Sequence, residues 1–250
     1  MPRYFFEIAY KGTAYAGWQS QPNAIGVQQV VEEKLAILSR QALEIVGSGR
    51  TDTGVHCAQQ FFHADFDFEI DTETFKRKLN GLLPVDISIK NIFLVLPQAH
   101  ARFDALSRSY EYRISNEKNA LLNGLVAHYF KPLDVVAMNE AAESLMGEHD
   151  FASFSKVNTD VKHFRCTITE AQWKQKDELL VFHISANRFL RGMVRAIVGT
   201  LLEVGNGKLT TSEFKEIVLA KDRKKAGMNA PPEGLFLTSV TYPERIFIKP

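Results

Sequence analysis

The sequence predicts an α+β protein made of two units of related design. The N-terminal half shows the order β-α-β-loop-β-α-β, without the long strand and helix alternation of parallel α/β folds. A comparable order restarts near Ala101. The length of 250 residues allows two domains of ordinary size. We therefore expect antiparallel sheets with helices on one face, and a division into residues 1–105 and 106–250.

The first unit follows from residue patterns in order. Arg3–Tyr10 is rich in β-forming residues and is bounded by Lys11-Gly12-Thr13, which predicts the first strand. Apolar residues at helical spacing from Val27 predict a helix that ends near Arg40. Strands are expected at Leu43–Val46 and Gln59–Phe66, a helix capped by Asp71 that stops before Pro84, and a closing strand at Ile87–Leu96.

The second unit is predicted in the same way. We expect a strand at Tyr110–Ile114, a helix from Asp134 to Leu145, and a loop without periodicity over Gly147–Asn158. Strands at Arg165–Lys174 and Leu179–Ala186 form a predicted hairpin around Lys176-Asp177. The remaining predictions are a long helix from about Arg188 to Val204, a shorter helix at Thr211–Leu219 and a last strand at Leu235–Tyr242.

The predicted long helix carries three arginines on an otherwise apolar segment. Arg188, Arg191 and Arg195 are spaced i, i+3 and i+7, which would place them on one helix face. A guanidinium held against an apolar helix is costly unless it meets a carboxylate or a phosphate. Arg195 lies deepest in the apolar run and is expected to be paired. A solvent-exposed stripe fits Arg188 and Arg191 better.

A glycine-rich loop over 47–56 displays one arginine and one carboxylate, Arg50 and Asp52. Glycines permit backbone geometry that a side chain forbids, and they allow close approach of other groups. Asp52-Thr53-Gly54 is also an ordinary turn sequence. The same tripeptide is catalytic in aspartic proteases, but that chemistry needs a second such aspartate, and no second Asp-Thr-Gly occurs here.

Two loop aromatics, Tyr15 and Trp18, follow the first predicted strand. Aromatic side chains in loops often cover a core. They also suit stacking on unpaired bases. Both interpretations stay open from the residues alone.

The composition is that of an ordinary soluble globular protein, with 45% hydrophobic and 24% charged residues. No apolar run is long enough to span a bilayer, and the N-terminus leads into a strand rather than a signal peptide. Cys57 and Cys166 are too few for a disulfide framework, so a reducing cytoplasm is expected. The net charge of +1 means that any polyanion site depends on local basic clusters, such as the run Lys221–Lys225.

Five separated stretches resemble the TruA-type tRNA pseudouridine synthases, in family order across nearly the whole chain. They are Tyr10-Lys11-Gly12-Thr13 with Gly17-Trp18-Gln19; Gly49-Arg50-Thr51-Asp52-Thr53-Gly54-Val55-His56; Ala101-Arg102-Phe103-Asp104 with Tyr110-Glu111-Tyr112; Phe189-Leu190 with Met193-Val194-Arg195; and Ala230-Pro231-Pro232-Glu233-Gly234-Leu235.

The resemblance implies conversion of uridine to pseudouridine in the tRNA anticodon stem-loop, typically at nucleotides 38 to 40, with neither cofactor nor metal. It also implies a homodimer that binds tRNA, while the lack of a bilayer-spanning apolar run predicts no membrane partner. Each chain would contain two ferredoxin-like, or RNP-like, units whose sheets join side by side around a cleft.

The resemblance also assigns roles to residues. Asp52 matches the catalytic aspartate, whose covalent and acid–base roles both remain open. Arg195 matches the arginine that pairs with this aspartate and keeps it ionised. Tyr110 matches the tyrosine that is expected to stack on the target base, and it is a candidate for the final proton removal. Arg50 matches the arginine that fills the space left by the flipped uridine. The residue patterns, rather than the resemblance, add Tyr15, Trp18, Arg188 and Arg191 to the expected RNA contacts.

One alternative is a non-catalytic tRNA-binding or folding protein on the same scaffold. The presence of Asp52, Tyr110 and Arg195 together argues against it. The aspartic protease suggested by Asp52-Thr53-Gly54 is a remote alternative.

Overall fold

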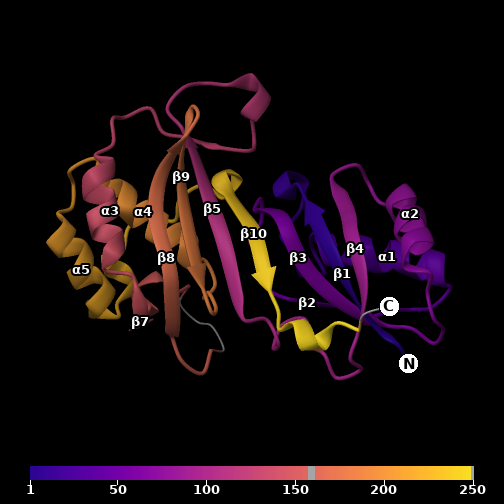
Figure 1. Ribbon diagram of the computed structural model, residues 1–250. Helices are drawn as coiled ribbons and strands as arrows, with labels where there is room; N and C mark the ends of the chain where they lie inside the picture. Colours follow the sequence, from indigo (N-terminus) through magenta and orange to yellow (C-terminus); the bar gives the residue numbers. More distant parts are fainter. Residues whose placement is uncertain (157–160, 249–250) are drawn as a thin grey trace. The chain divides into compact units, whose positions relative to one another are not determined.

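The computed structural model describes residues 1–156 and 161–248, which contain five α-helices and ten β-strands (Figure 1). The protein is therefore of mixed α and β class. The chain divides into two compact units, one formed by Met1–Ser107 with Leu237–Pro250 and the other by Arg108–Phe236. This division differs from the expected one into residues 1–105 and 106–250, because the C-terminal segment groups with the N-terminal unit.

The first unit is built on an antiparallel sheet. Its strands are β1 (Arg3–Tyr10), β2 (Val46–Gly47), β3 (His56–Asp65) and β4 (Ile87–Val95), and its helices are α1 (Val27–Ser39) and α2 (Thr72–Leu82). β1 pairs with both β3 and β4, and β2 pairs with β3. α2 packs against β4, and α1 packs against α2 (Figure 1).

Side chains alternate across β1, and both faces are buried. Phe6 stacks on Phe62 of β3 with ring centroids 4.8 Å apart and meets Phe75 of α2. Phe5 points to the other face, where Tyr242 lies 5.2 Å from it, centroid to centroid. The segment after the last strand thus covers the second face of this sheet, which explains why it belongs to this unit.

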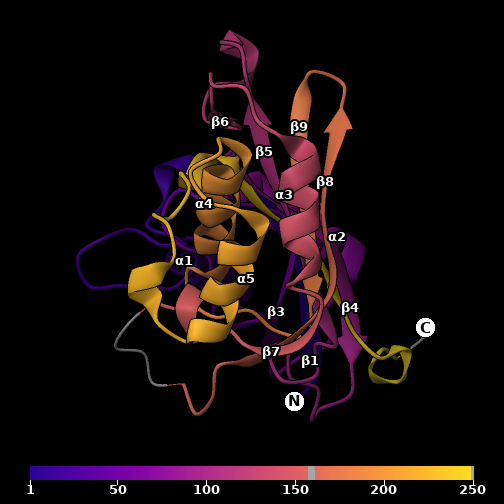
Figure 2. The same ribbon diagram turned by 90° about the vertical axis from the view of Figure 1, so that its left-hand side faces the viewer.

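Strands of the second unit are β5 (Ser107–Ser115), β6 (Ala127–His128), β7 (Gly147–Asp150), β8 (Arg165–Lys176) and β9 (Leu179–Ala186); β10 (Leu235–Thr241) has residues in both units. The order β5-β9-β8-β7 is antiparallel, and β6 runs parallel to β5. The helices α3 (Val135–Glu143), α4 (Met193–Gly205) and α5 (Thr211–Ala220) pack together over this sheet (Figure 2).

Helix starts follow the predicted caps. The Asp71 carboxylate accepts from the Thr74 N–H at 2.8 Å, one residue before α2, and Asp134 accepts from the Ala137 N–H at 2.9 Å before α3. Each cap satisfies a backbone donor that the first helical turn leaves open. Short 3₁₀ turns occupy Gly12–Ala14, Ala120–Leu122, Ala152–Phe154, Arg223–Lys225, Pro232–Gly234 and Glu244–Ile246. No helix within the described residues is long and apolar enough to cross a membrane.

Candidate functional site

The loop that carries Asp52 starts from β2 and is fastened to β3. The Ser48 N–H donates to the Phe61 carbonyl at 2.7 Å, and the Gln60 side-chain amide donates to the Gly49 carbonyl at 3.3 Å. Closer to Asp52, the Thr51 hydroxyl lies 2.9 Å from the Tyr10 hydroxyl. The residues on the N-terminal side of Asp52 are therefore held by β3 and β1 rather than by regular structure of their own.

A second brace comes from the loop after β1. The Trp18 N–H donates to the Thr51 carbonyl at 3.3 Å, and the Gly54 N–H donates to the Tyr15 carbonyl at 3.3 Å. Gly17 adopts a φ of +87°, and a Cβ at this position would stand 2.2 Å from the Thr51 carbonyl oxygen. Only glycine allows this approach of two backbones. Backbone hydrogen bonds and this close approach thus hold Gly17-Trp18 and the Asp52 loop in a fixed arrangement.

Asp52 begins a β-turn. The Val55 N–H donates to the Asp52 carbonyl at 3.2 Å, and Gly54 has a φ of +79°. A positive φ at the third residue of a turn requires glycine or a similarly permissive residue. The turn interpretation of Asp52-Thr53-Gly54 is thus confirmed. The turn is compatible with a functional role for this loop, since the Asp52 side chain is half-buried and Arg50 is exposed.

Tyr110 and Arg195 both belong to the second unit. Tyr110 lies on β5 opposite Ile184 of β9, half-buried, and its ring meets Phe189 edge-on with centroids 5.0 Å apart. Arg195 stands in the first turn of α4, where its Nε donates to the Ala230 carbonyl at 2.7 Å. The Ala230 N–H donates in return to the Arg195 carbonyl at 2.9 Å. The Arg195 side chain is therefore fixed on a specific backbone group.

Two contacts shape the segment before Ala230, and a third attaches it to α4. Arg223 donates to the carbonyls of Ala226 and Gly227 at 3.1 and 3.0 Å. The Gly227 N–H donates to the Thr200 hydroxyl at 3.0 Å. Arg223 belongs to the basic run expected to attract a polyanion, but here its guanidinium organises the loop that ends at the Arg195 anchor.

Tyr112 is a supporting residue that the sequence interpretation did not single out. Its hydroxyl donates to the Pro231 carbonyl at 2.9 Å, next to Ala230. Burial raises the pKa of the Tyr112 phenol, the nearby Glu233 carboxylate raises it further, and Arg195 lowers it. The strand period of two places Tyr112 on the same face as Tyr110. The alternation of side chains along the predicted strand was therefore the sequence signal that could have identified Tyr112.

Comparisons with known proteins show which family this chain belongs to. The sequence pattern of a family described as tRNA pseudouridine synthase matches residues 8–104 and 141–243. A tRNA pseudouridine synthase A of Parabacteroides distasonis is 51% identical over 248 residues, covering 99% of this chain and 98% of the relative. The protein of the same name from Porphyromonas gingivalis is 48% identical over 252 residues, covering 99% and 100%.

The chain belongs to the tRNA pseudouridine synthase family.

The family assignment extends beyond one bacterial group. A tRNA pseudouridine synthase A of a Geobacillus species is 41% identical over 238 residues, which cover 94% of this chain and 96% of the relative. Arg50, Asp52 and Arg195 lie inside the matched ranges of the family, whereas Tyr110 lies between them. Membership in a pseudouridine synthase family argues against a protease site at Asp52-Thr53-Gly54.

Tyr15 and Trp18 do not fit the role of base-stacking platforms in such an enzyme. The Trp18 side chain is 1% exposed, with its ring 6.1 Å from Tyr10 and 6.0 Å from Phe62, centroid to centroid. Tyr15 is buried, and its hydroxyl donates to the Asp86 carboxylate at 2.7 Å. A ring packed in this way cannot stack on a base without leaving the core. Both aromatics support the loop of Asp52 from inside.

The arginine stripe predicted on the long helix is also corrected. α4 begins at Met193, so Arg188 and Arg191 lie in the connection from β9 and share no helix face with Arg195. Gly192, with a φ of +72°, stands immediately before the helix, where the chain turns. Arg191 is exposed, and an Arg188 nitrogen lies 3.4 Å from the His163 ring. Arg188 and Arg191 remain candidates for RNA contact, but helical spacing no longer supports that role.

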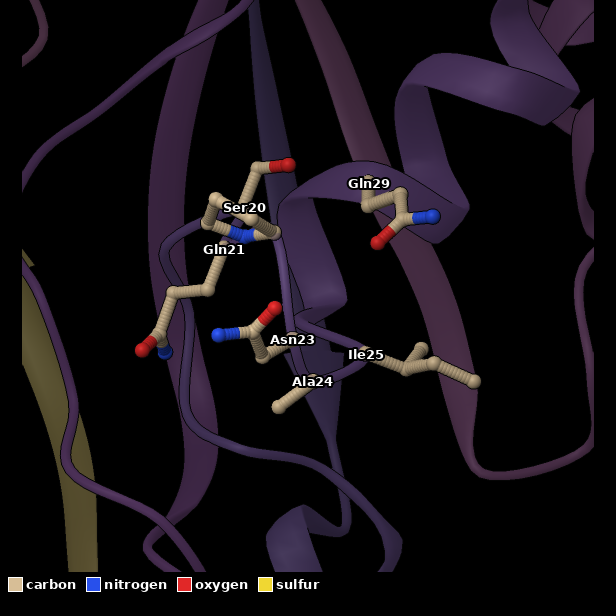
Figure 3. A pocket seen from close by; sticks show the side chains of 7 residues that line it. Ser20, Gln21, Asn23, Ala24, Ile25 and Gln29 are labelled. Atoms are coloured by element: carbon tan, nitrogen blue, oxygen red, sulfur yellow. The ribbon is translucent and has the colours of Figure 1, made fainter.

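A shallow pocket of about 760 Å³ opens beside the loop 20–25 and contains none of the expected site residues (Figure 3). Amides and apolar groups line it, namely Ser20, Gln21, Pro22, Asn23, Ala24, Ile25 and Gln29. It offers neither an acid nor a base for catalysis. Across residues 1–156 and 161–248, no group of three or more His, Cys, Asp or Glu side chains is placed to hold a metal ion.

Proposed function

We propose that this protein converts uridine to pseudouridine in tRNA, within the anticodon stem-loop at nucleotides 38 to 40. One observation carries the proposal: the family match includes the loop of Asp52, and full-length relatives named tRNA pseudouridine synthase A reach 51% identity. The anticodon stem-loop and its nucleotides come from the resemblance of the motifs around Asp52, Tyr110 and Arg195.

The reaction needs a carboxylate that acts while the base stays bound. The bond between the ribose C1′ and the uracil N1 breaks, the uracil turns, a bond forms between C1′ and C5, and the proton on C5 leaves while N1 gains one. Asp52 is the proposed reactive group, and nucleophilic attack and proton abstraction are the two chemistries open to it. The brace of Gly17-Trp18 supports this role, because a reacting group must be held in place.

Arg195 is proposed to pair with Asp52 and keep it ionised, as an adjacent guanidinium favours the charged carboxylate. Its anchor on Ala230 supports a positioning role of this kind. Tyr110 is proposed to stack on the target uracil, and it is half-buried rather than sealed in the core. Arg50, which is exposed, is proposed to fill the space left by the flipped nucleotide.

The finer architecture belongs to the same proposal. Two ferredoxin-like units would lie side by side with the reaction cleft between them, and a homodimer in the cytoplasm would bind one tRNA through both subunits. In the first unit β1 lies between β4 and β3, and β2 pairs with β3, which supports the ferredoxin-like description. A steep fall of tRNA affinity with added salt is the expected sign of phosphate contacts.

The test is modification of an unmodified tRNA transcript by the purified protein, mapped by carbodiimide labelling and primer extension. We expect new stops at anticodon stem-loop uridines and no requirement for added metal or cofactor. Tight binding of the same transcript without any pseudouridine would instead support the non-catalytic tRNA-binding protein. Neither binding nor modification would overturn the proposal.

A further inference from the structure

The connection between β4 and β5 contains a rigid turn at residues 100–104. The His100 N–H donates to the Asp104 carboxylate at 2.7 Å, and the Asp104 N–H donates to the His100 carbonyl at 3.0 Å. The N–H groups of Arg102 and Phe103 both donate to the His100 Nδ1, at 3.1 and 3.3 Å. One imidazole and one carboxylate therefore organise this turn, although it is neither helix nor strand.

The base of the turn is fixed to the core of the first unit. The Ala101 N–H donates to the buried His63 Nδ1 at 3.2 Å, and the Ala101 carbonyl accepts from the Tyr242 hydroxyl. Two residues earlier, the Ala99 carbonyl accepts from Arg3 of β1 at 2.8 Å. Such bracing from three directions makes the turn a fixed platform.

This platform displays an aromatic ring to solvent. The Phe103 side chain is 75% exposed, and its ring leans on the His100 ring with centroids 4.3 Å apart. The Arg102 guanidinium lies 5.7 Å from the centre of the Phe103 ring, and Arg102 is itself exposed. A large apolar ring that an ordered backbone holds in water contributes little to the stability of the fold, because such a side chain is stabilising only when it is buried.

We propose that Phe103 and Arg102 form a binding site for an unpaired nucleotide of the tRNA, outside the catalytic residues. The inference rests on the proposed function, which supplies an RNA with unpaired loop bases. An exposed ring offers a face on which any base stacks, and an adjacent arginine adds attraction to the phosphate and the base. A protein partner would need a wider apolar surface than one ring.

Another exposed phenylalanine provides a matched control. Phe68 is 42% exposed in the same unit, but it stands between Asp67 and Glu69, whose charges repel a phosphate backbone. The substitution of phenylalanine by leucine removes the same ring at both positions and keeps an apolar side chain. The comparison therefore separates an aromatic contact from a general loss of surface apolarity.

The experiment measures affinity for an unmodified tRNA transcript by fluorescence anisotropy, with turnover and thermal unfolding recorded for each protein. Phe103→Leu should bind about five- to tenfold more weakly, because base stacking on an aromatic ring is worth at least that factor. Phe103→Tyr should bind as the wild type does, and so should Phe68→Leu. Arg102→Gln should lower the slope of log affinity against log salt by about one.

Wild-type affinity in Phe103→Leu, for a transcript that the wild type binds and modifies, would overturn this inference and leave the proposed function intact. Equal weakening by Phe68→Leu would do the same, since the effect would then not be specific to the platform. A change of oligomeric state in Phe103→Leu would also overturn the inference, because it would show that a second copy of the chain covers the ring. Failure of the wild type itself would instead count against the proposed function.

Discussion

Gly199 offers a sharp test of the idea that the segment before Ala230 positions Arg195. Gly199 lies within α4, and an added Cβ would stand 1.8 Å from the Met228 carbonyl oxygen. Restoring an ordinary contact of 3.4 Å requires a shift of about 1.6 Å by the helix or by the facing segment. The hydrogen bond of 2.7 Å between Arg195 and Ala230 cannot survive such a shift unchanged.

Two effects of Gly199→Ala oppose each other. Alanine favours the helix over glycine by up to about 1 kcal/mol, while forced overpacking costs about 1 to 3 kcal/mol. We expect a net loss of stability of about 1 to 2 kcal/mol. The effect on turnover should be larger, because a misplacement of about 1 Å in a reacting constellation can reduce the rate about 100-fold.

The assay is tritium release from tRNA labelled at C5 of uridine, at saturating tRNA, together with thermal unfolding. Gly81→Ala is the matched control, since Gly81 lies within α2 and an added Cβ there meets nothing within 4 Å. Gly81→Ala should keep full turnover and stability. Wild-type turnover and melting temperature in Gly199→Ala would refute the positioning role assigned to this segment.

Three further predictions concern other supports of the site. Trp18→Ala should lower the free energy of unfolding by about 3 to 5 kcal/mol, measured by urea denaturation; a stable variant with only weakened tRNA binding would restore the base-stacking role. Burial, with the nearby charge of Arg3, lowers the pKa of His63 to about 4. The unfolded chain therefore binds more protons between pH 6.5 and 4, so the free energy of unfolding should decrease by about 1.4 kcal/mol for each unit by which the pH is lowered through this range. His63→Gln should flatten that slope in urea titrations at pH 7 and 5, and an unchanged slope would exclude His63 as its source. Arg223→Gln should lower kcat about tenfold without changing the salt dependence of tRNA binding, whereas Lys224→Gln should leave kcat unchanged; a reduced salt slope in Arg223→Gln would show a phosphate contact instead of a clamp.

Local signals in the sequence predicted most elements of the fold. Arg3–Tyr10 is a strand with the predicted bounds, and Asp71 and Asp134 cap helices where expected. Apolar periodicity and short-range caps suffice for such elements, because the interactions that define them lie within a few residues.

The errors arose where distant contacts decide the structure. The apolar residues from Phe189 resemble a continuation of α4, yet Gly192 adopts a left-handed conformation and the helix starts after it. The four residues Gly147–Asp150 lack alternation, and they become β7 only by pairing with β8; the end of that expected loop, at 157–158, lies outside the described residues.

In the candidate site, too, local features could be predicted from the sequence, whereas contacts between distant residues could not. The motif around Asp52 indicates a shaped loop, and the structure explains its shape through Gly17, Gly54 and the hydroxyl of Tyr10. The burial of Trp18 could not be read from its own neighbours, because it depends on packing against Phe62 in a later strand. The anchor of Arg195 joins residues 35 positions apart in the chain.

The most direct test of the central claim is the turnover of Asp52→Asn on unmodified tRNA. The amide has nearly the shape of the carboxylate but can neither attack as a nucleophile nor accept a proton at neutral pH. We predict no pseudouridine by carbodiimide mapping, with tRNA affinity and melting temperature close to those of the wild type. Asp67→Asn, an exposed carboxylate of the same unit, should remain fully active. Pseudouridine formation by pure Asp52→Asn protein at the wild-type rate would contradict the account.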